Sequence, residues 1–386
     1  MPRVASTFFL AILSLALAAG AGEVAVRVLG VAPAVDDKGM IVPPKEFEWD
    51  TTSNAGGWHD VEHERAKPAD VYRVLILGDS YVEARHVPLD STFCRHLERR
   101  LNDARTEAEA RGEAAGAMGA PDARADSTPR PSRAEVIAIG HRGWSQREEL
   151  AALEREGLAL EPDLVALCFL GFNDVTGNSP VLRARAKEQE ETLLMKRPGQ
   201  TRVPLSSLAG LVVPASHLNR FVSYRLTLLT ARLEGAADRD APLEATIPVD
   251  YLVYCDTNDP EWPRAWAETE SLTARIRDLS EAAGARFLLV SLTMPQGYYP
   301  EGLADLVRAY PALARAGADL ARPDSAIAQI AARRGFDLVA LAPAFRERYA
   351  RDGERLHFAV NGHWNEAGHK LAAEVIALEM AKRNLP

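Results

Sequence analysis

The chain has 386 residues and a formal net charge of -9, which is the wrong sign for a protein that holds phosphate backbones. Nucleic acid is therefore excluded as an expected partner. The 3 cysteines, Cys94, Cys168 and Cys255, lack the close paired spacing of a zinc site or a disulfide framework, although a pairing of Cys94 with Cys255 stays open. We expect no metal and no cofactor. The length allows several domains, but we expect one catalytic domain with insertions.

The amino terminus, residues 1–30, is predicted to be a membrane anchor or an export signal. Residues 5–22 carry no charge and are rich in Leu, Ala and Phe, and their number is close to that of a bilayer span. A retained anchor is favoured, because the apolar character resumes after Glu23. The small residues Ala19-Gly20-Ala21 also fit a signal peptidase site. Either option sends the rest of the chain to the extracytoplasmic, periplasmic side. A buried terminal helix of a cytosolic protein is the third option.

The catalytic domain is predicted to span residues 71–386, after a lead-in over residues 31–70 that has no sustained periodicity. Residues 74–77 form an unbroken apolar run, which indicates a strand buried on both faces. Apolar residues then recur at helical spacing up to Leu101. Residues 103–134 are Ala, Arg, Glu, Gly and Pro with almost no large apolar side chain, so we expect a disordered insertion there.

Strands and helices alternate through the rest of the domain. Ser145-Gln146-Arg147-Glu148 has the spacing of a capping box that begins a helix, and Asn365 is a good N-cap for the last helix. Further strands are predicted at residues 136–139, 164–170, 286–292 and 336–341. This alternation predicts a five-stranded parallel sheet with helices on both faces, a three-layer α/β/α sandwich.

Residues 175–250 show no clear rhythm of strands and helices. The segment leaves the sheet at the carboxyl end of the third strand, where long insertions often shape a substrate pocket. We therefore expect it to cover the site. A structural flap that only covers core surface is the alternative.

Polar residues follow the buried strands at the edge where α/β sheets bind ligands. Ser80 follows the first strand and begins a helix, as a nucleophile would. Asn173 follows the third strand, and Gly143 follows the second; both can donate N–H groups to a developing oxyanion. His363 lies just before the last helix and is the candidate base. Each residue taken singly has an ordinary reading as a turn, cap or core residue.

Together, Gly78-Asp79-Ser80-Tyr81, Gly143, Gly171-Phe172-Asn173-Asp174 and the string from Asn361 to His369 resemble the SGNH (GDSL-type) hydrolases. The resemblance runs from about Asn54 to the carboxyl end, without the Ala-rich insertion, and is greatest to bacterial exported or membrane-anchored members. It implies a flavodoxin-like sheet and the cleavage or transfer of acyl esters. It also implies that Ser80 is the nucleophile, Gly143 and Asn173 form the oxyanion hole, and His363 is the base.

One position departs from that family. Relatives with this string usually carry an aspartate two residues before the histidine, where this chain has Asn361. An asparagine carbonyl can accept the imidazole N–H but supplies no negative charge. Three options follow: Asn361 orients His363, a carboxylate such as Asp352 or Glu354 replaces it, or the site works as a dyad.

The sequence thus predicts a serine esterase that cleaves a small acyl ester, such as an O-acetyl group on a sugar or a cell-envelope glycan, through a Ser80 acyl-enzyme. Two alternatives share the same residues. One is an O-acyltransferase acting on a cell-envelope carbohydrate, which differs only in the acceptor of the acyl group. The other is a catalytically weak glycan-binding protein, because a fold alone does not fix an activity.

Overall fold

A computed structural model describes residues 2–30, 34–35, 41–42, 45–117, 131–194, 217–218, 221–222, 225 and 246–385. The chain divides into two compact units. The first comprises residues 1–45 and 187–248, and the second comprises residues 46–186 and 249–386. The second unit contains the sheet and all of the predicted site residues.

The first unit contains helix α1, Pro2–Leu29, and a short antiparallel pair of strands, β1 (Ala34–Val35) and β2 (Ile41–Val42). The Glu23 carboxylate of α1 accepts the backbone N–H groups of His217 (3.1 Å) and Leu218 (2.7 Å). Among the described residues, no helix is both long and apolar enough to cross a membrane. Most of residues 190–245 lies outside the described residues, so the covering of the site by residues 175–250 stays a prediction.

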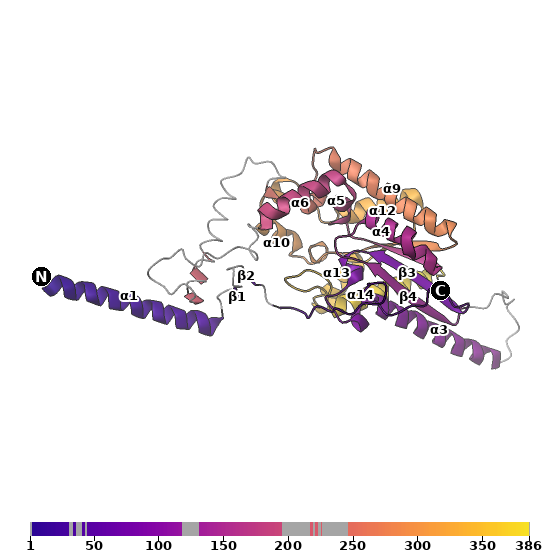
Figure 1. Ribbon diagram of the computed structural model, residues 1–386, viewed down its shortest axis with the longest axis horizontal. Helices are drawn as coiled ribbons and strands as arrows, with labels where there is room; N and C mark the ends of the chain where they lie inside the picture. The colour runs from indigo at the N-terminus through magenta and orange to yellow at the C-terminus, as the bar shows by residue number, and fades with distance from the viewer. Residues whose placement is uncertain are drawn as a thin grey trace. The chain divides into compact units, whose positions relative to one another are not determined.

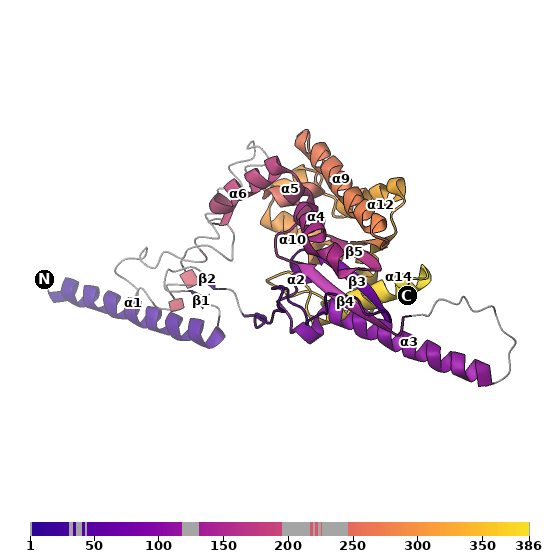
Figure 2. The same cartoon turned by 45° about the vertical axis from the view of Figure 1, so that its right-hand side comes forward.

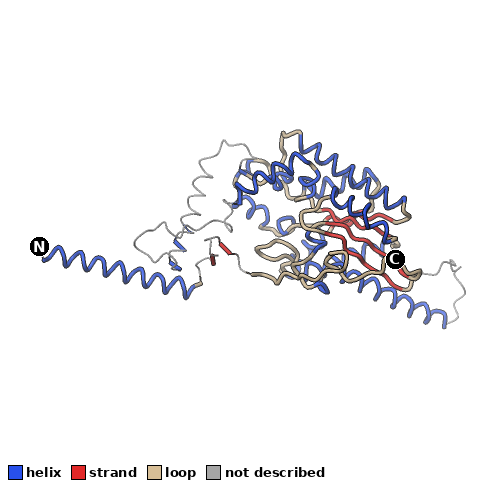
Figure 3. Tube along the Cα trace, in the orientation of Figure 1, coloured by secondary structure: helices blue, strands red, loops and turns tan. Residues whose placement is uncertain are grey.

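The second unit is built on the predicted parallel sheet, drawn in red in Figure 3. Its strand order is β4-β3-β5-β6-β7, and all four neighbouring pairs are parallel. The strands are β3 (Val71–Gly78), β4 (Arg133–Gly140), β5 (Leu164–Phe169), β6 (Arg286–Ser291) and β7 (Leu338–Ala340). The five-stranded α/β architecture predicted from the sequence is therefore confirmed, and the strand order is that of flavodoxin-like sheets.

Helices cover both faces of this sheet (Figures 1 and 2). One face is packed by α3 (Phe93–Ala117) and α14 (Glu366–Lys382), and the other by α4 (Gln146–Ala152), α9 (Glu261–Ala282) and α12 (Arg322–Arg334). Every residue of β3 is buried, which explains its unbroken apolar sequence. The other helices are α2 (Ser80–Glu83), α5 (Asp174–Asn178), α6 (Pro180–Leu194), α10 (Gly302–Ala309), α11 (Ala312–Arg315) and α13 (Ala342–Asp352), with 3₁₀ turns at Leu89–Ser91, Leu158–Leu160, Val249–Tyr254 and Pro295–Gly297 and a π turn at Leu153–Gly157.

Strand β4 lies at one edge of the sheet, and side chains from outside the sheet occupy its free backbone N–H groups. The three acceptors are Asn102 Oδ1 (2.7 Å), Glu98 Oε2 (2.8 Å) and Asp60 Oδ2 (2.8 Å), bonded to the N–H groups of Ala134, Val136 and Ala138. Unpaired N–H groups on an edge strand are a template for another strand. Here the edge is closed by α3 and by the lead-in segment.

One sequence prediction needs correction, and one open option is settled. Residues 103–134 were expected to be disordered, but helix α3 continues to Ala117 and β4 begins at Arg133; residues 118–130 lie outside the described residues. Ala, Arg and Glu are strong helix formers, and this propensity extends a helix that is already nucleated by packing at Phe93 and Leu97. All 3 cysteines are buried and free, so the open pairing of Cys94 with Cys255 is not made.

Candidate active site

The site is built where β3 and β5 end, on either side of the point at which the strand order reverses. From β3 the chain passes to β4 on one side, and β5 lies on the other side. Loops leaving neighbouring strands in opposite directions open a crevice at the carboxyl edge of such a sheet. Ser80 begins α2 directly after β3, and Asn173 stands directly before α5 after β5. His363 reaches the same edge from the loop before α14.

The turn that presents Ser80 is tight and fixed by its neighbours. Gly78 ends β3 where any Cβ would lie 2.4 Å from a methyl group of Val82, so only glycine fits. Asp79 caps the short helix, because its Oδ1 accepts the Tyr81 N–H at 2.9 Å. Ser80 is thereby held as the first residue of α2, with its hydroxyl partly exposed.

Ser80, His363 and Asn361 form a continuous line of hydrogen bonds. His363 Nε2 lies 2.8 Å from Ser80 Oγ, and His363 Nδ1 lies 2.5 Å from Asn361 Oδ1. The His363 backbone N–H also donates to this Asn361 atom at 3.3 Å, so the atom is the amide oxygen, which can only accept. Nδ1 therefore carries the proton, and Nε2 offers its lone pair to the serine O–H.

The two carboxylates considered as replacements for Asn361 do not fit this geometry. Asp352 forms an ion pair with Arg351, at 2.7 Å, and Glu354 forms one with Arg348, at 3.3 Å. Neither contacts the imidazole within the described residues. Asn361 thus takes the orienting place without a charge. Burial lowers the pKa of His363 to about 4, while the Asn361 contact opposes that shift.

Asn173 and Gly143 are placed as N–H donors on two sides of the serine turn. Asn173 Nδ2 donates one hydrogen to Asp79 Oδ2 at 3.0 Å, which leaves its second hydrogen for a ligand. Gly143 has φ +74° in an exposed turn after β4, and among the described residues its N–H has no partner. This turn is tied to α2, because the Arg142 N–H donates to Glu83 Oε2 at 3.0 Å. No direct contact joins Gly143 to Ser80 in the described structure.

A cluster of buried acids supports the Asn173 turn from behind. Asp174 Oδ2 accepts the Leu170 N–H (2.8 Å) and Gln146 Nε2 (2.7 Å), which closes the turn around Asn173. Burial raises the pKa of Asp79 to about 6 and raises the pKa values of Glu149 and Asp174 well above their ordinary range. No cation lies beside Glu149 or Asp174 in the described residues, so nothing there offsets the effect of burial, which disfavours their charged forms.

Two residues that the sequence did not single out hold His363 in place. The His86 ring stacks on the His363 ring with centroids 3.9 Å apart and planes 17° from parallel. Burial and the nearby His363 lower the pKa of His86 to about 3, so His86 does not compete for the proton. The Tyr81 hydroxyl donates to the Gly362 carbonyl at 3.0 Å and links the serine turn to the histidine loop. Tyr81 follows the Gly-Asp-Ser string and could have been suspected, whereas no sequence signal marks His86.

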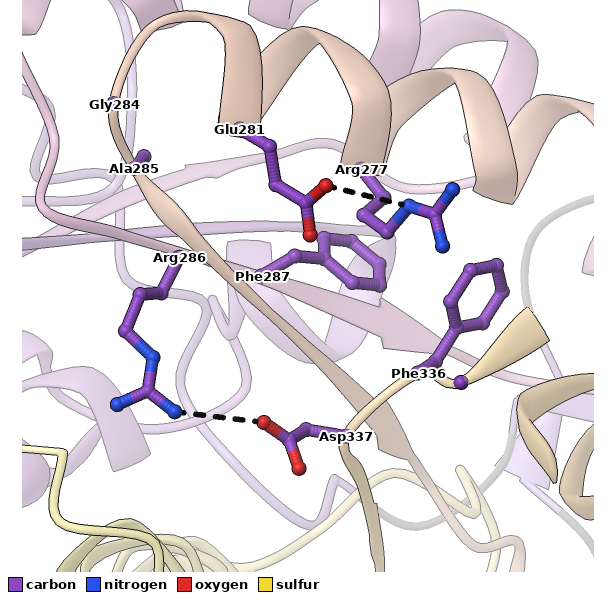
Figure 4. Close-up of a pocket in the computed structure, with 9 residues that line it drawn as sticks. Arg277, Glu281, Gly284, Ala285, Arg286, Phe287, Phe336 and Asp337 are labelled. Atoms are coloured by element: carbon purple, nitrogen blue, oxygen red, sulfur yellow. Dashed lines mark ion pairs between the residues drawn. The ribbon is translucent and has the colours of Figure 1, made fainter.

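A separate depression of about 380 Å³ lies at the other end of the sheet (Figure 4). Its charged groups face one another: Arg286 at the start of β6 lies 3.6 Å from Asp337, and Arg277 lies 3.8 Å from Glu281. Its lining includes no serine, cysteine or histidine. It is therefore separate from the arrangement of Ser80, His363 and Asn361.

Neither a family model nor a curated protein sequence matches the chain. Solved structures that it resembles include an acetyl xylan esterase from Geobacillus stearothermophilus, with 13% identity and a TM-score of 0.40 over 80% of this chain and 94% of that one. A lipase/acylhydrolase from Enterococcus faecalis has 14% identity and a TM-score of 0.35 over 81% of this chain and 96% of that one. The acetyl xylan esterase AlAXEase has 12% identity and a TM-score of 0.40 over 79% of this chain and 97% of that one. At such low identities and TM-scores the likeness says nothing of activity, and it is the strand order that defines the fold.

Proposed function

We propose that this protein is a serine esterase of the SGNH type that cleaves small acyl esters outside the cytoplasm. The observation that carries the proposal is the line Ser80 Oγ, His363 Nε2 and Nδ1, Asn361 Oδ1, with gaps of 2.8 Å and 2.5 Å. A serine hydroxyl becomes a useful nucleophile only when a base takes its proton, and this line supplies a base in the productive tautomer.

The reaction proceeds by acyl transfer in two halves. Ser80 Oγ attacks the ester carbonyl carbon while its proton passes to His363 Nε2. The carbonyl oxygen becomes negative and is met by the free Asn173 N–H and by the Gly143 backbone N–H. When the tetrahedral intermediate collapses, the C–O bond to the alcohol breaks and the alcohol leaves with the proton from Nε2. Water then gives a proton to Nε2 and attacks the acyl carbon. When this second tetrahedral intermediate collapses, the bond to Ser80 Oγ breaks, Oγ takes the proton back from Nε2, and the carboxylic acid leaves.

The acyl group is proposed to be small, such as O-acetyl, on a carbohydrate of the cell envelope. Trp49 supports a carbohydrate alcohol, because this residue is 40% exposed and packs edge-on against His86, the ring that stacks on His363. The Arg142 guanidinium lies 5.5 Å from the centre of the Trp49 ring, so an aromatic and a cationic group lie together near the site, and a sugar can pack there. The charge-free run of residues 5–22 supports export or membrane attachment through residues 1–30. Amino-terminal sequencing of the protein from cells will show whether residues 1–30 are removed or retained.

The experiment that tests the proposal is labelling with a fluorophosphonate probe, followed by peptide mapping. We expect one equivalent of label on Ser80, none in Ser80→Ala, and slow labelling in His363→Ala. Hydrolysis of p-nitrophenyl acetate should follow the same order, and added sugar alcohols should reveal whether the acyl group goes to water or to a hydroxyl. An unlabelled Ser80 in the folded wild-type protein would overturn the proposal and favour a binding role.

A further inference from the structure

The lead-in segment reaches the catalytic loop through one carboxylate. Glu46 Oε1 accepts the Val360 N–H at 2.9 Å, and Glu46 Oε2 accepts the Asn361 N–H at 2.7 Å. Two adjacent backbone donors are thus held by the two oxygens of a single carboxylate. Hydrogen bonds to a charged acceptor are stronger and shorter than neutral ones, so this contact fixes the backbone directly before His363.

The residues that follow Glu46 act on His363 indirectly, through the His86 ring. Phe47 packs on Phe358 (centroids 4.9 Å apart) and on His86 (5.0 Å), and Trp49 also packs on His86 (5.2 Å). His86 in turn stacks on the catalytic imidazole. Residues 46–49, here called the strap, therefore hold both the backbone before His363 and the ring that lies against it.

The double contact matters because Asn361, which orients His363, is uncharged. Asn361 is an exposed residue, and Gly362 after it, at φ +80°, has no side chain to restrict the backbone. An aspartate carboxylate would bind the imidazole N–H through its charge. A neutral amide oxygen accepts that N–H about as well as a water molecule does, so water can replace it. The Asn361 oxygen stays aimed at Nδ1 only while the backbone that carries it is fixed.

We propose, on the basis of the esterase function above, that Glu46 is a positioning residue for the base. Its carboxylate clamps Val360 and Asn361 so that an uncharged asparagine can hold His363 in the productive tautomer. The strap thereby fixes the position of Asn361, which replaces the charge that an aspartate would supply. The strap itself lies outside the sheet and its crossover helices.

The test compares Glu46→Ala and Glu46→Gln with Glu62→Gln. Glu62 is a matched control, because it belongs to the same lead-in segment and its carboxylate also accepts a backbone N–H, that of Ala55 at 2.7 Å. We expect kcat for p-nitrophenyl acetate to fall about 10- to 100-fold in both Glu46 variants with KM little changed, as for a small misplacement of a catalytic group. Glu62→Gln should keep kcat within twofold of the wild type. Glu46→Asp should recover part of the loss.

A second readout does not depend on turnover. In protein labelled with ¹⁵N-histidine, the His363 ring signals, assigned by their loss in His363→Ala, should report an Nδ1–H tautomer in the wild type and a mixture of tautomers in Glu46→Ala. Glu46 variants that keep both kcat and the wild-type tautomer would overturn the inference. If the wild type itself shows no turnover, the esterase proposal fails, and the tautomer comparison still decides whether Glu46 positions His363.

Discussion

The two ends of the parallel sheet differ in how their polar groups are paired. At the amino end, Arg286 and Asp337 stand across strands β6 and β7 and neutralise each other in an open depression. At the carboxyl end, Ser80 and His363 are hydrogen-bonded to each other, and the Gly143 N–H has no partner among the described residues. Acids behind this end, Glu149 and Asp174, are buried without a cation among those residues.

The polar groups at the amino end are paired in a way that suits stability, whereas those at the carboxyl end are placed in a way that suits chemistry. An exposed ion pair satisfies both charges and contributes little beyond that. Buried acids without a cation, such as Glu149 and Asp174, are costly to the fold, and such costs gather at functional sites. Substitutions at the two ends of the sheet test this difference.

The largest effect is expected for Ser80→Ala and His363→Ala. Because these residues act as one unit, either change should lower kcat for p-nitrophenyl acetate by about 10⁴-fold or more, and the double variant should be no worse than the single ones. A steady-state assay with each purified variant checks this. Additive losses in the double variant would contradict a shared mechanism.

The second largest loss of kcat is expected for Asn173→Ala. Loss of one oxyanion donor costs about 10²- to 10³-fold in kcat, and KM should change little because the donor acts on charge that develops during the reaction. The measurement is again kcat and KM, accompanied by the melting temperature to exclude unfolding. A rise in KM at constant kcat would show instead that Asn173 only binds the ground state.

Asn361→Asp should shift the pH dependence of the reaction. The base works in its neutral form, so the wild-type rate should fall only as pH drops through about 4, the lowered pKa of His363. A carboxylate beside Nδ1 favours imidazolium and raises that pKa, which moves the acid limb of kcat/KM to higher pH. The plateau rate should be equal or higher. A large loss of plateau activity would mean that the asparagine itself is required.

Glu149→Gln should change stability, and the sign follows from the raised pKa of Glu149. The folded state keeps the proton that the unfolded chain releases above about pH 4.3, so the stability that Glu149 contributes is present at low pH and is lost as pH rises. A neutral glutamine removes this loss. Urea titrations should show the variant more stable by about 1–3 kcal/mol at pH 8 and little different near pH 4. Parallel curves at both pH values would contradict a buried neutral acid.

The smallest effect is expected for Arg286→Ala at the amino end. Both partners of this pair are nearly half exposed, so the unfolding free energy should change by about 0.5 kcal/mol or less. The kinetics with p-nitrophenyl acetate should match the wild type. A loss of activity here would show that the two ends of the sheet are not independent.

Sequence periodicity was sufficient to predict the sheet, because strands buried on both faces leave long apolar runs such as residues 74–77. The meeting of Ser80 with His363 was also predictable, since Ser80 follows a strand that ends at the carboxyl edge of the sheet and His363 lies in the loop before the last helix, beside that edge. The choice of Asn361 over Asp352 or Glu354 was not predictable, because ion pairs with Arg351 and Arg348 depend on side-chain placement. Glu46 and His86 act across long separations in the chain, and no local pattern marks such contacts.

The closed edge at β4 has a consequence for assembly. The backbone N–H groups of Ala134, Val136 and Ala138 are already bonded to side chains. These donors are therefore not available to pair with a strand from another molecule at this edge. The opposite border, β7, has only 3 residues, which is too short for strong pairing. Copies of this chain that associate will therefore meet through helices or loops, and the sheet will not grow beyond its own five strands.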